Sequence, residues 1–363
     1  MLSRKSAPPF DLIPVVLLSG LLLFGLLMVY DSSSAQALLT FHDKYYFLKE
    51  QAKWIVFGLA AGVAAFFFDY RRLQQLALPI LIAALVLLLA VFLPGLSIRA
   101  YGAHRWINLG VFVLQPSEFA KLAAIIYFAT WLNKPQKGKL LSFFLLLGIL
   151  VGLIILEPDM GTAIVLLGTS LAIYFLSDNQ LKPLLFTIPV MAGAALALII
   201  HSPYRLKRLL TFISPDSDPL GASYHIRQAL IALGSGGLLG IGLGNSRQKY
   251  SYLPEANTDS IFAIIGEELG FLGGLFVICT VAYFLYRCFQ HTRQVSDKFG
   301  QLLGLGIISW LATQTIVNLG SMVALIPLTG VPLPFISYGG SALVVELVGV
   351  GILFNIWKHN LHR

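Results

Sequence analysis

An acid and a base stand three residues apart in the segment QPSEFAK (115–121), namely Glu118 and Lys121. On a helix this spacing places both side chains on one face, where they can neutralise each other. A lone carboxylate or ammonium in hydrocarbon would cost about 3 kcal/mol, so the pair must face a bundle interior or a wet cavity. Two interpretations are open from the spacing: a structural ion pair that fixes helix packing, and a pair that shapes a substrate cavity.

A second acidic position is Asp259, in the segment YLPEANTDS (252–260) that precedes a long apolar run. Thr258 or Asp259 could cap the helix that the apolar run predicts. Alternatively, a carboxylate held at a membrane surface could remove a proton from a substrate hydroxyl. Three further acids fall inside apolar runs and are harder to dismiss as loop charges: Glu267, Glu268 and Glu346.

Basic residues in the predicted outer loops offer the complementary chemistry. Arg and Lys stabilise charge that develops on a leaving phosphate, which favours a site for a lipid-linked phosphate or pyrophosphate. Headgroup binding, or the freedom of a long translocated loop from charge bias, would also explain these residues. The candidate substrate-binding residues are Lys49, Arg105, Arg205, Arg208, Arg247, Lys249, Glu255 and Ser337.

The composition indicates which elements must position these residues. Of the 363 residues, 57% are hydrophobic and only 12% are charged, which is typical of a polytopic membrane protein and excludes a disordered or secreted disulfide-rich chain. We expect an all-α protein with one transmembrane domain over 1–363. Ten membrane-spanning helices are predicted near 11–30, 52–69, 76–93, 118–132, 140–156, 162–177, 183–200, 261–286, 301–323 and 338–357. The fourth and sixth runs are shorter than a full span.

The distribution of basic residues orients these helices. With the N-terminus inside, thirteen Lys and Arg residues fall in inner loops and six in the short outer loops, so both termini should be cytoplasmic. A long connection over about 201–260 then lies outside, where we expect short helices along the membrane surface. Within it, the glycine-rich stretch 234–244 lacks the spacing of a nucleotide loop, and we expect it to bend tightly or approach a lipid headgroup.

A second outer stretch, 326–341, is rich in Pro and Gly and cannot continue as a helix. Non-helical backbone at membrane depth is tolerated only where it is buried in protein or lines a cavity. We therefore expect this stretch to line the same outer cleft as Asp259.

The sequence also argues against nucleic-acid binding, a metal site, a disulfide framework and a cleaved signal segment. The net charge of +8 comes without a basic block of the kind that binds nucleic acid, and the histidines have no metal-ligand spacing. The two cysteines, Cys279 and Cys288, suggest neither a disulfide framework nor a metal site. The first apolar run is longer than a typical signal segment and is predicted to be an uncleaved helix.

Four segments resemble the SEDS family of shape, elongation, division and sporulation proteins. They are LQPSEFAKLA (114–123), EPDMGTA (157–163), the run from Tyr224 to Gly273, and PLTGVPLPFISYGGSALV (327–344). The segments GNSRQKYSYLPEANTD and YDSSSAQA are more similar to the FtsW division branch, with its sporulation relative SpoVE, than to RodA. The family pattern PEAHTDF has His and Phe where this chain has Asn257 and Ser260, which leaves the aspartate in place without an adjacent histidine.

The resemblance implies a ten-helix peptidoglycan glycosyltransferase that polymerises lipid II at the outer face of the bacterial cytoplasmic membrane. It implies a role in septal wall synthesis, with Asp259 as the essential carboxylate and with Glu118 and Lys121 as an intramembrane pair. The implied partners are the undecaprenyl-pyrophosphate-linked glycan, a class B penicillin-binding protein that supplies the transpeptidase, and other division proteins of the membrane. The resemblance establishes no cofactor, and a divalent cation, Mg²⁺ or Mn²⁺, could help to neutralise the leaving pyrophosphate.

Three other functions are weighed against this one. A flippase for lipid II would also use intramembrane polar residues and broken helices, but the sequence has no inverted repeat and its polar groups gather on one side. An elongation-type polymerase, similar to RodA, would carry out the same reaction. A non-catalytic scaffold would use the same residues to bind partner helices.

Overall fold

The computed structural model of the protein describes residues 11–93, 95–100, 103–108, 110, 113–134, 139–177, 193, 206, 210, 212, 223–250 and 252–361. In chain order, the elements are α1 (Ile13–Phe41), α2 (Tyr46–Phe67), α3 (Tyr70–Ala90), β1 (Ser97–Ala100), β2 (Ala103–Asn108), β3 (Val113–Leu114), α4 (Pro116–Leu132), α5 (Lys139–Leu156), α6 (Met160–Leu176), α9 (Tyr224–Ser235), α10 (Ile261–Arg293), α11 (Lys298–Met322) and α12 (Gly340–Leu361).

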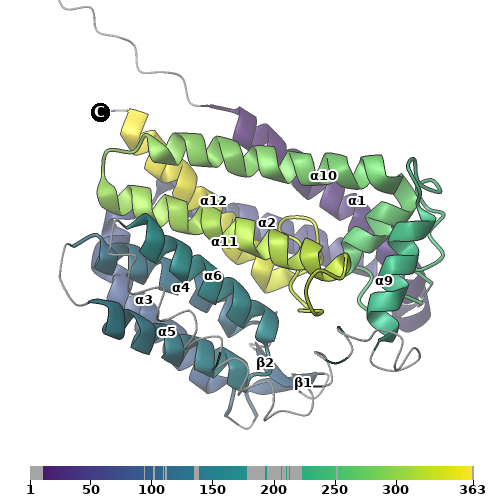
Figure 1. Ribbon diagram of the computed structural model, residues 1–363, viewed down its shortest axis with the longest axis horizontal. Coiled ribbons are helices and arrows are strands. Elements are labelled where there is room, and N and C mark those ends of the chain that lie inside the picture. Colours follow the sequence, from purple (N-terminus) through teal and green to yellow (C-terminus); the bar gives the residue numbers. More distant parts are fainter. Residues whose placement is uncertain are drawn as a thin grey trace, which may run out of the picture.

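The helices form two groups that meet along α11. One group contains α1, α2, α10 and α12, and the other contains α3, α4, α5 and α6 (Figure 1). Helix α11 packs against α4 and α6 on one side and against α10 and α12 on the other. The apolar segments of α11 and α12 are each 72% buried, compared with 28% for α3 and α10. Helices α11 and α12 are therefore central in the bundle, while α3 and α10 present apolar side chains to the surroundings.

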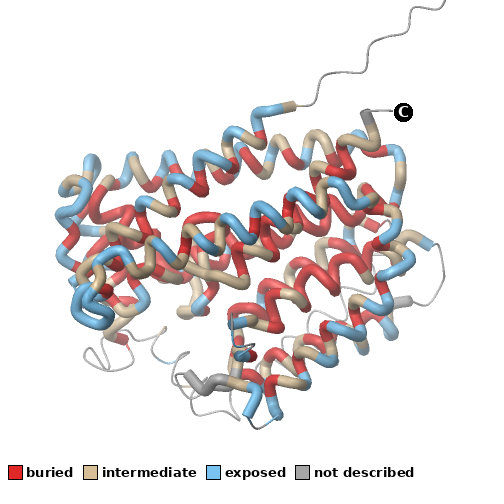
Figure 2. Tube along the Cα trace, turned by 180° about the vertical axis from the view of Figure 1, so that it is seen from behind, coloured by how far each residue is buried: buried red, intermediate tan, exposed pale blue. Residues whose placement is uncertain are grey.

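The burial pattern is that of a protein surrounded by lipid. Exposed residues run along the outward sides of the peripheral helices and buried residues gather between the helices (Figure 2). Many of the exposed side chains are large and apolar, such as Leu39, Phe67 and Phe276, each at least 70% exposed. Five helices, α1, α3, α10, α11 and α12, are long and apolar enough to cross a membrane by length and composition. The predicted all-α membrane architecture is confirmed.

The predicted helices correspond well to the observed ones. Nine of the ten predicted segments contain a helix, and the tenth, 183–200, lies outside the described residues except for residue 193. Helix α1 continues to Phe41, past the predicted end near residue 30. In the long outer connection, one short helix is present, α9, whereas most of 201–222 lies outside the described residues.

A small antiparallel sheet was not predicted. Strand β2 pairs with β1 and with β3, and β3 leads through Gln115 directly into α4. The sheet therefore fixes the chain just before the segment that carries Glu118 and Lys121.

Small residues allow α2 and α12 to approach closely. A Cβ atom at Gly351 would lie 2.1 Å from the carbonyl oxygen of Gly62, and a Cβ at Gly340 would lie 2.3 Å from Cε2 of Trp54. Close backbone approach through small residues is a common means of packing helices in a membrane, because the hydrophobic effect does not drive helices together in lipid.

Helix α10 is broken at Gly270, where φ is 70° and ψ is −170°. The glycine-rich stretch replaces the missing helical hydrogen bonds. The amides of Ile241 and Gly242 donate to the carbonyls of Glu267 and Glu268, and the amides of Phe271 and Leu272 donate to the carbonyls of Gly237 and Leu238. The glycines thus bend the chain tightly, as the sequence suggested, and allow it to approach the backbone of a helix.

The two ends of the described chain lie on the same side of the bundle (Figure 1). Asp11, just before α1, accepts hydrogen bonds from Arg287 and His291 near the end of α10, and the His291 ring packs on Trp357 near the end of α12. Burial alone would raise the pKa of Asp11, but these hydrogen bonds outweigh it and lower the pKa to about 2. Asp11 is therefore ionised at neutral pH and ties the start of α1 to the end of α10, and His291 extends the contact to α12.

The backbone hydrogen bonds between the glycine-rich stretch and the break in α10, called the α10 splice below, generate a prediction. Gly240 has φ near +80°, and a Cβ there would lie 2.1 Å from the carbonyl oxygen of Glu268. Gly240→Ala should therefore lower the free energy of unfolding by about 1–3 kcal/mol. The matched control is Gly234→Ala in α9, where a Cβ meets nothing within 4 Å, and which should be neutral or stabilising by roughly 0.5–1 kcal/mol. Thermal unfolding in detergent measures both, and equal midpoints for the two variants would contradict the splice.

Candidate functional site

A polar cavity of about 710 Å³ lies at the end of the bundle opposite the termini. Its walls come from α2, the sheet, the first turn of α9, the segment before α10, and the Pro/Gly-rich stretch that leads into α12. The polar side chains that line it are Arg105, Gln115, His225, Glu255, Thr258, Asp259, Tyr338 and Ser341. Apolar surface is supplied mainly by Trp54, Trp106, Phe212, Ile226 and Pro254. A mixture of aromatic surface with a few convergent polar groups is typical of a ligand site.

Asp259 lies on the cavity wall and is 8% exposed. The hydroxyl of Thr258 donates to Oε2 of Glu255 over 2.8 Å and lies 3.2 Å from Oδ1 of Asp259. Gly330 faces the other carboxylate oxygen, because a Cβ at this glycine would lie 3.8 Å from Oδ2. The absence of a side chain at Gly330 keeps space beside the carboxylate.

The segment that carries Asp259 is fixed from three directions. His225 of α9 lies 2.6 Å from Oγ of Ser260, measured from Nε2. The amide of Tyr338 donates to the carbonyl of Asn257 over 2.9 Å. Asn318 of α11 donates to the backbone carbonyl of Asp259 over 2.8 Å. The carboxylate is therefore part of a rigid wall and not of a mobile loop.

The helix cap that the sequence allowed for Thr258 or Asp259 is wrong. The N-cap of α10 is Ser260, whose side chain makes no capping hydrogen bond. Because the chain turns tightly over Glu255 to Ser260, both residues lie before the cap. Asp259 is thus directed to the cavity and does not satisfy the helix end.

Arg105 reaches the cavity from β2, whereas Asp259 comes from the segment before α10. Its guanidinium donates to the carbonyls of Glu157 and Pro158, in the turn between α5 and α6. The neighbouring Gln115 donates to Oδ2 of Asp159 in the same turn, over 3.1 Å. These bonds attach the sheet to the turn and place a permanent positive charge at the cavity.

Tyr338 supplies a neutral phenol to the cavity. Burial raises its pKa to about 12, and the charges of Glu50 and Tyr46 act in the same direction. Its ring packs edge-on against Phe47 of α2 at 5.2 Å. The hydroxyl therefore remains a hydrogen-bond donor throughout the physiological range of pH.

Glu118 and Lys121 form the predicted ion pair, with 2.8 Å between Oε2 and Nζ. The side chains are 2% and 1% exposed, and neither lines the polar cavity defined by the described residues. Lys121 also donates to Oε1 of Gln314 over 2.9 Å and lies 5.2 Å from the ring centroid of Trp310. The pair is therefore buried between α4 and α11, and it begins about one helical turn after Gln115.

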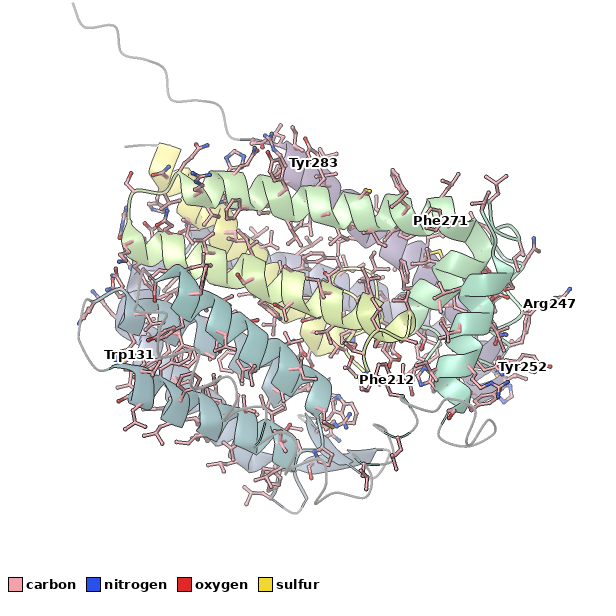
Figure 3. The ribbon with its side chains drawn as sticks, in the orientation of Figure 1. Trp131, Phe212, Arg247, Tyr252, Phe271 and Tyr283 are labelled. Carbon is pink, nitrogen blue, oxygen red and sulfur yellow. The ribbon has the colours of Figure 1, made fainter. Side chains whose placement is uncertain are left out.

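Among the predicted substrate-binding residues that the structure describes, most lie outside the cavity lining. Arg105 and Glu255 line the cavity, whereas Ser337 is buried beside it and accepts a hydrogen bond from the amide of Leu333. Lys49 pairs with Asp43 at the surface. Arg247 lies at the outer edge of the molecule (Figure 3). Arg205 and Arg208 lie outside the described residues.

Lys249 has a structural setting instead. Its ammonium lies 2.9 Å from Asp31 of α1 and 3.0 Å from Glu268 of α10, and it is almost fully buried. Glu268 also accepts from the amides of Gly244 and Ser246, and Glu267 accepts from Ser246 and the amide of Arg247. Glu267 and Glu268 therefore hold the glycine-rich stretch onto α10.

Several cavity residues were missed by sequence reasoning. His225 stands in α9 and meets Ser260 across 35 positions of sequence, a contact that no local spacing reveals. Gln115 and Tyr338 belong to segments that the sequence singled out, but their individual positions carry no signal of their own. Among the described residues, no group of three His, Cys, Asp or Glu side chains could hold a metal ion.

The comparisons with known proteins give a consistent result. The family of cell cycle proteins that groups FtsW, RodA and SpoVE matches residues 11–362. A probable peptidoglycan glycosyltransferase FtsW of Trichlorobacter lovleyi is 40% identical, covering 96% of this chain and 93% of that protein. Stage V sporulation protein E of Bacillus subtilis is 37% identical, covering 99% of this chain and 100% of that protein.

Solved structures show the same fold. A chain of a peptidoglycan synthase complex, described for its coordination of polymerization and crosslinking, superposes with a TM-score of 0.80 at 27% identity. The match covers 97% of this chain and 98% of that one. The rod shape determining protein RodA of Thermus thermophilus superposes with a TM-score of 0.71 at 26% identity, with 97% of each chain covered.

Glu157 generates a prediction about stability. The side chain is fully buried in the turn after α5, and neither carboxyl oxygen has a hydrogen-bond partner within the described structure. Burial raises its pKa from 4.5 to about 9, the charge of Asp159 adds to the rise, and Arg105 opposes it. Between these values the unfolded chain ionises Glu157 while the folded protein keeps it protonated, so this group makes folding less favourable as pH rises.

Glu157→Gln cannot ionise and should escape this loss. Its stability relative to the natural chain should increase from pH 5 to pH 9, by up to about 1.4 kcal/mol per pH unit. Thermal unfolding in detergent across this range measures the difference. Asp43→Asn is the control, because the hydrogen bond from Lys49 lowers the pKa of this exposed carboxyl and keeps it ionised throughout the range. Parallel pH profiles for Glu157→Gln and the natural chain would contradict the assignment.

Proposed function

This chain belongs to the family of FtsW, RodA and SpoVE, and we propose that it joins lipid II units into glycan strands for the septal wall. The activity class is that of a peptidoglycan glycosyltransferase in a multi-pass membrane protein of the bacterial cytoplasmic membrane. The single observation that supports the site is Asp259, held by three flanking elements on the wall of a polar cavity that is large enough for sugar.

The orientation of the chain favours catalysis outside the cell. Asp11 binds α1 to the end of α10, and Asp259 lies before the beginning of α10, so the termini and the cavity occupy opposite ends of this helix. With cytoplasmic termini, as the basic residues indicate, the cavity opens at the extracytoplasmic face.

The reaction needs one base. The 4-hydroxyl oxygen of the acceptor's GlcNAc attacks the anomeric carbon of the donor's MurNAc, and the bond from that carbon to the pyrophosphate oxygen breaks. Undecaprenyl pyrophosphate leaves with the bonding electron pair, the anomeric carbon is inverted, and the hydroxyl proton passes to Asp259. Because pyrophosphate is already a good leaving group, the general acid that a glycoside hydrolase uses is unnecessary.

Arg105 has the complementary role. In a displacement with inversion, the attacking and leaving oxygens lie on opposite faces of the anomeric carbon. Arg105 comes from β2, and Asp259 comes from the segment before α10, and both line one cavity. We infer that they serve opposite faces of one sugar. A fixed guanidinium in a partly desolvated cavity stabilises the charge that develops on the pyrophosphate.

A partner is suggested by the same comparisons. The solved structure with the TM-score of 0.80 is a chain of a complex that coordinates polymerization and crosslinking. A class B penicillin-binding protein would supply the crosslinking reaction to this chain, within an assembly of other membrane proteins of cell division.

Asp259→Asn tests the proposal. The variant keeps the size of the side chain and loses the base, so the rate of lipid II polymerisation should fall at least about 100-fold. The assay uses purified protein in detergent, with and without the transpeptidase partner, and separates glycan strands by length. Detergent has no two sides, so product formed there also distinguishes a polymerase from a flippase or a scaffold.

Asp43→Asn is the matched control, because Asp43 is an exposed acid that pairs with Lys49 away from the cavity. Its rate should equal that of the natural chain. If Asp259→Asn polymerised lipid II as fast as this control, the carboxylate would not be the base.

A further inference from the structure

Two buried amide side chains stand one turn apart on α11, and neither lines the polar cavity. Gln314 and Asn318 are both 0% exposed. Their spacing of four residues places them on one face of the helix, the face toward the Pro/Gly-rich stretch. A role for the two amides rests on the proposed function, because it concerns how that same site is held.

Asn318 ties two walls of the cavity to one nitrogen atom. Its Nδ2 donates to the carbonyl of Asp259 and to the carbonyl of Val331, each over 2.8 Å. Val331 follows Gly330, the residue that faces the Asp259 carboxylate. One amide group therefore sets the separation between the base and the backbone opposite to it.

Gln314 links the same stretch to the buried ion pair. Its Oε1 accepts from Lys121 over 2.9 Å and from Trp310 over 2.8 Å. Its Nε2 donates to the carbonyl of Pro332 over 3.1 Å and to Oε1 of Glu346 over 2.8 Å. The amide uses its two donor hydrogens and both acceptor lone pairs, which is the arrangement that most strongly fixes one side-chain orientation.

Glu346 completes the connection. Its second carboxylate oxygen accepts from the amide of Phe335 over 3.0 Å. Val331, Pro332 and Phe335 are thus held at three points by α11 and α12, along a stretch that has no helix or strand of its own. Backbone of this kind is stable in a membrane bundle only when its polar groups are paired.

We propose that Gln314 and Asn318 are positioning residues, through which the Glu118–Lys121 pair acts on the base and the stretch opposite to it. The ion pair does not line the cavity in the described structure, so direct contact with substrate does not account for it. Lys121 instead orients Gln314, Gln314 holds Pro332, and Asn318 holds Val331 and Asp259. Loss of any member should lower turnover through the geometry of Asp259, while substrate binding is retained.

The test separates this role from a purely structural one. Gln314→Glu keeps the shape and the acceptor for Lys121 but loses both donors. Asn318→Leu keeps a similar volume and loses the two bonds to the cavity walls. Small displacements of a reacting group cost up to about 100-fold in rate, so each variant should lower kcat between about 10-fold and 100-fold with KM changed by less than about twofold. Binding of lipid II, followed by the fluorescence of Trp54 and Trp106 in the cavity, should be unchanged.

Thr315→Val is the matched control. Thr315 is buried on the same helix, and among the described residues its hydroxyl bonds only to the carbonyl of Leu311 within that helix. Its kcat and KM should equal those of the natural chain, and thermal unfolding in detergent should show that all variants are folded. If Asn318→Leu does not fold, Asn318→Ser keeps one donor and should give an intermediate loss of kcat.

The double variant of Gln314→Glu with Asn318→Leu tests whether the two residues form one unit. If they do, kcat of the double variant should be close to that of the less active single variant, because effects within a unit are not additive. A fold-loss of kcat equal to the product of the two single fold-losses would show that the two residues act independently. Unchanged kcat in both single variants, or a raised KM with unchanged kcat in Lys121→Met, would overturn the positioning role. If the natural chain itself does not polymerise lipid II, the proposed function fails instead.

Discussion

Polar groups buried in a bundle that faces hydrocarbon must find their partners inside the protein, and this requirement organises the whole molecule. The chain departs from helical backbone at the Pro/Gly-rich stretch and at the break in α10. In both places a second segment supplies the missing hydrogen bonds: α11 and α12 in the first, and the glycine-rich stretch in the second. The Pro/Gly-rich stretch lines the cavity, so the pairing that stabilises its irregular backbone also shapes the site.

Local spacing made part of this predictable. Glu118 and Lys121 are three residues apart on one helix, and such a pair can be inferred without knowing the fold. The apolar runs likewise predicted the helices, because length and composition alone decide what can cross a membrane. The partners of those elements were not predictable. Gln314 meets Lys121 across 193 positions, and Asn318 meets Asp259 across 59.

The basic residues illustrate the other limit of sequence reasoning. Charge type suggested that Arg105 and Lys249 share a role, yet one lines the cavity and the other is locked between Asp31 and Glu268. The difference depends on a small sheet and on the α10 splice. Both are contacts between separate segments, and no local sequence pattern predicts either of them. Resemblance to the family identified Asp259, but the family histidine is missing and the structure brings His225 from α9 to the neighbouring Ser260.

The α10 splice also has an evolutionary consequence. Gly236, Gly240 and Gly270 lie against backbone atoms, with 1.9 Å to 2.2 Å available to an added Cβ, so no other amino acid fits at these positions. Leu238 and Leu239, within the same stretch, are 70% and 78% exposed and meet no such barrier. Substitutions accepted by descendants of this chain should therefore differ sharply between adjacent positions. The glycines should stay unchanged, whereas the two leucines should accept other apolar residues.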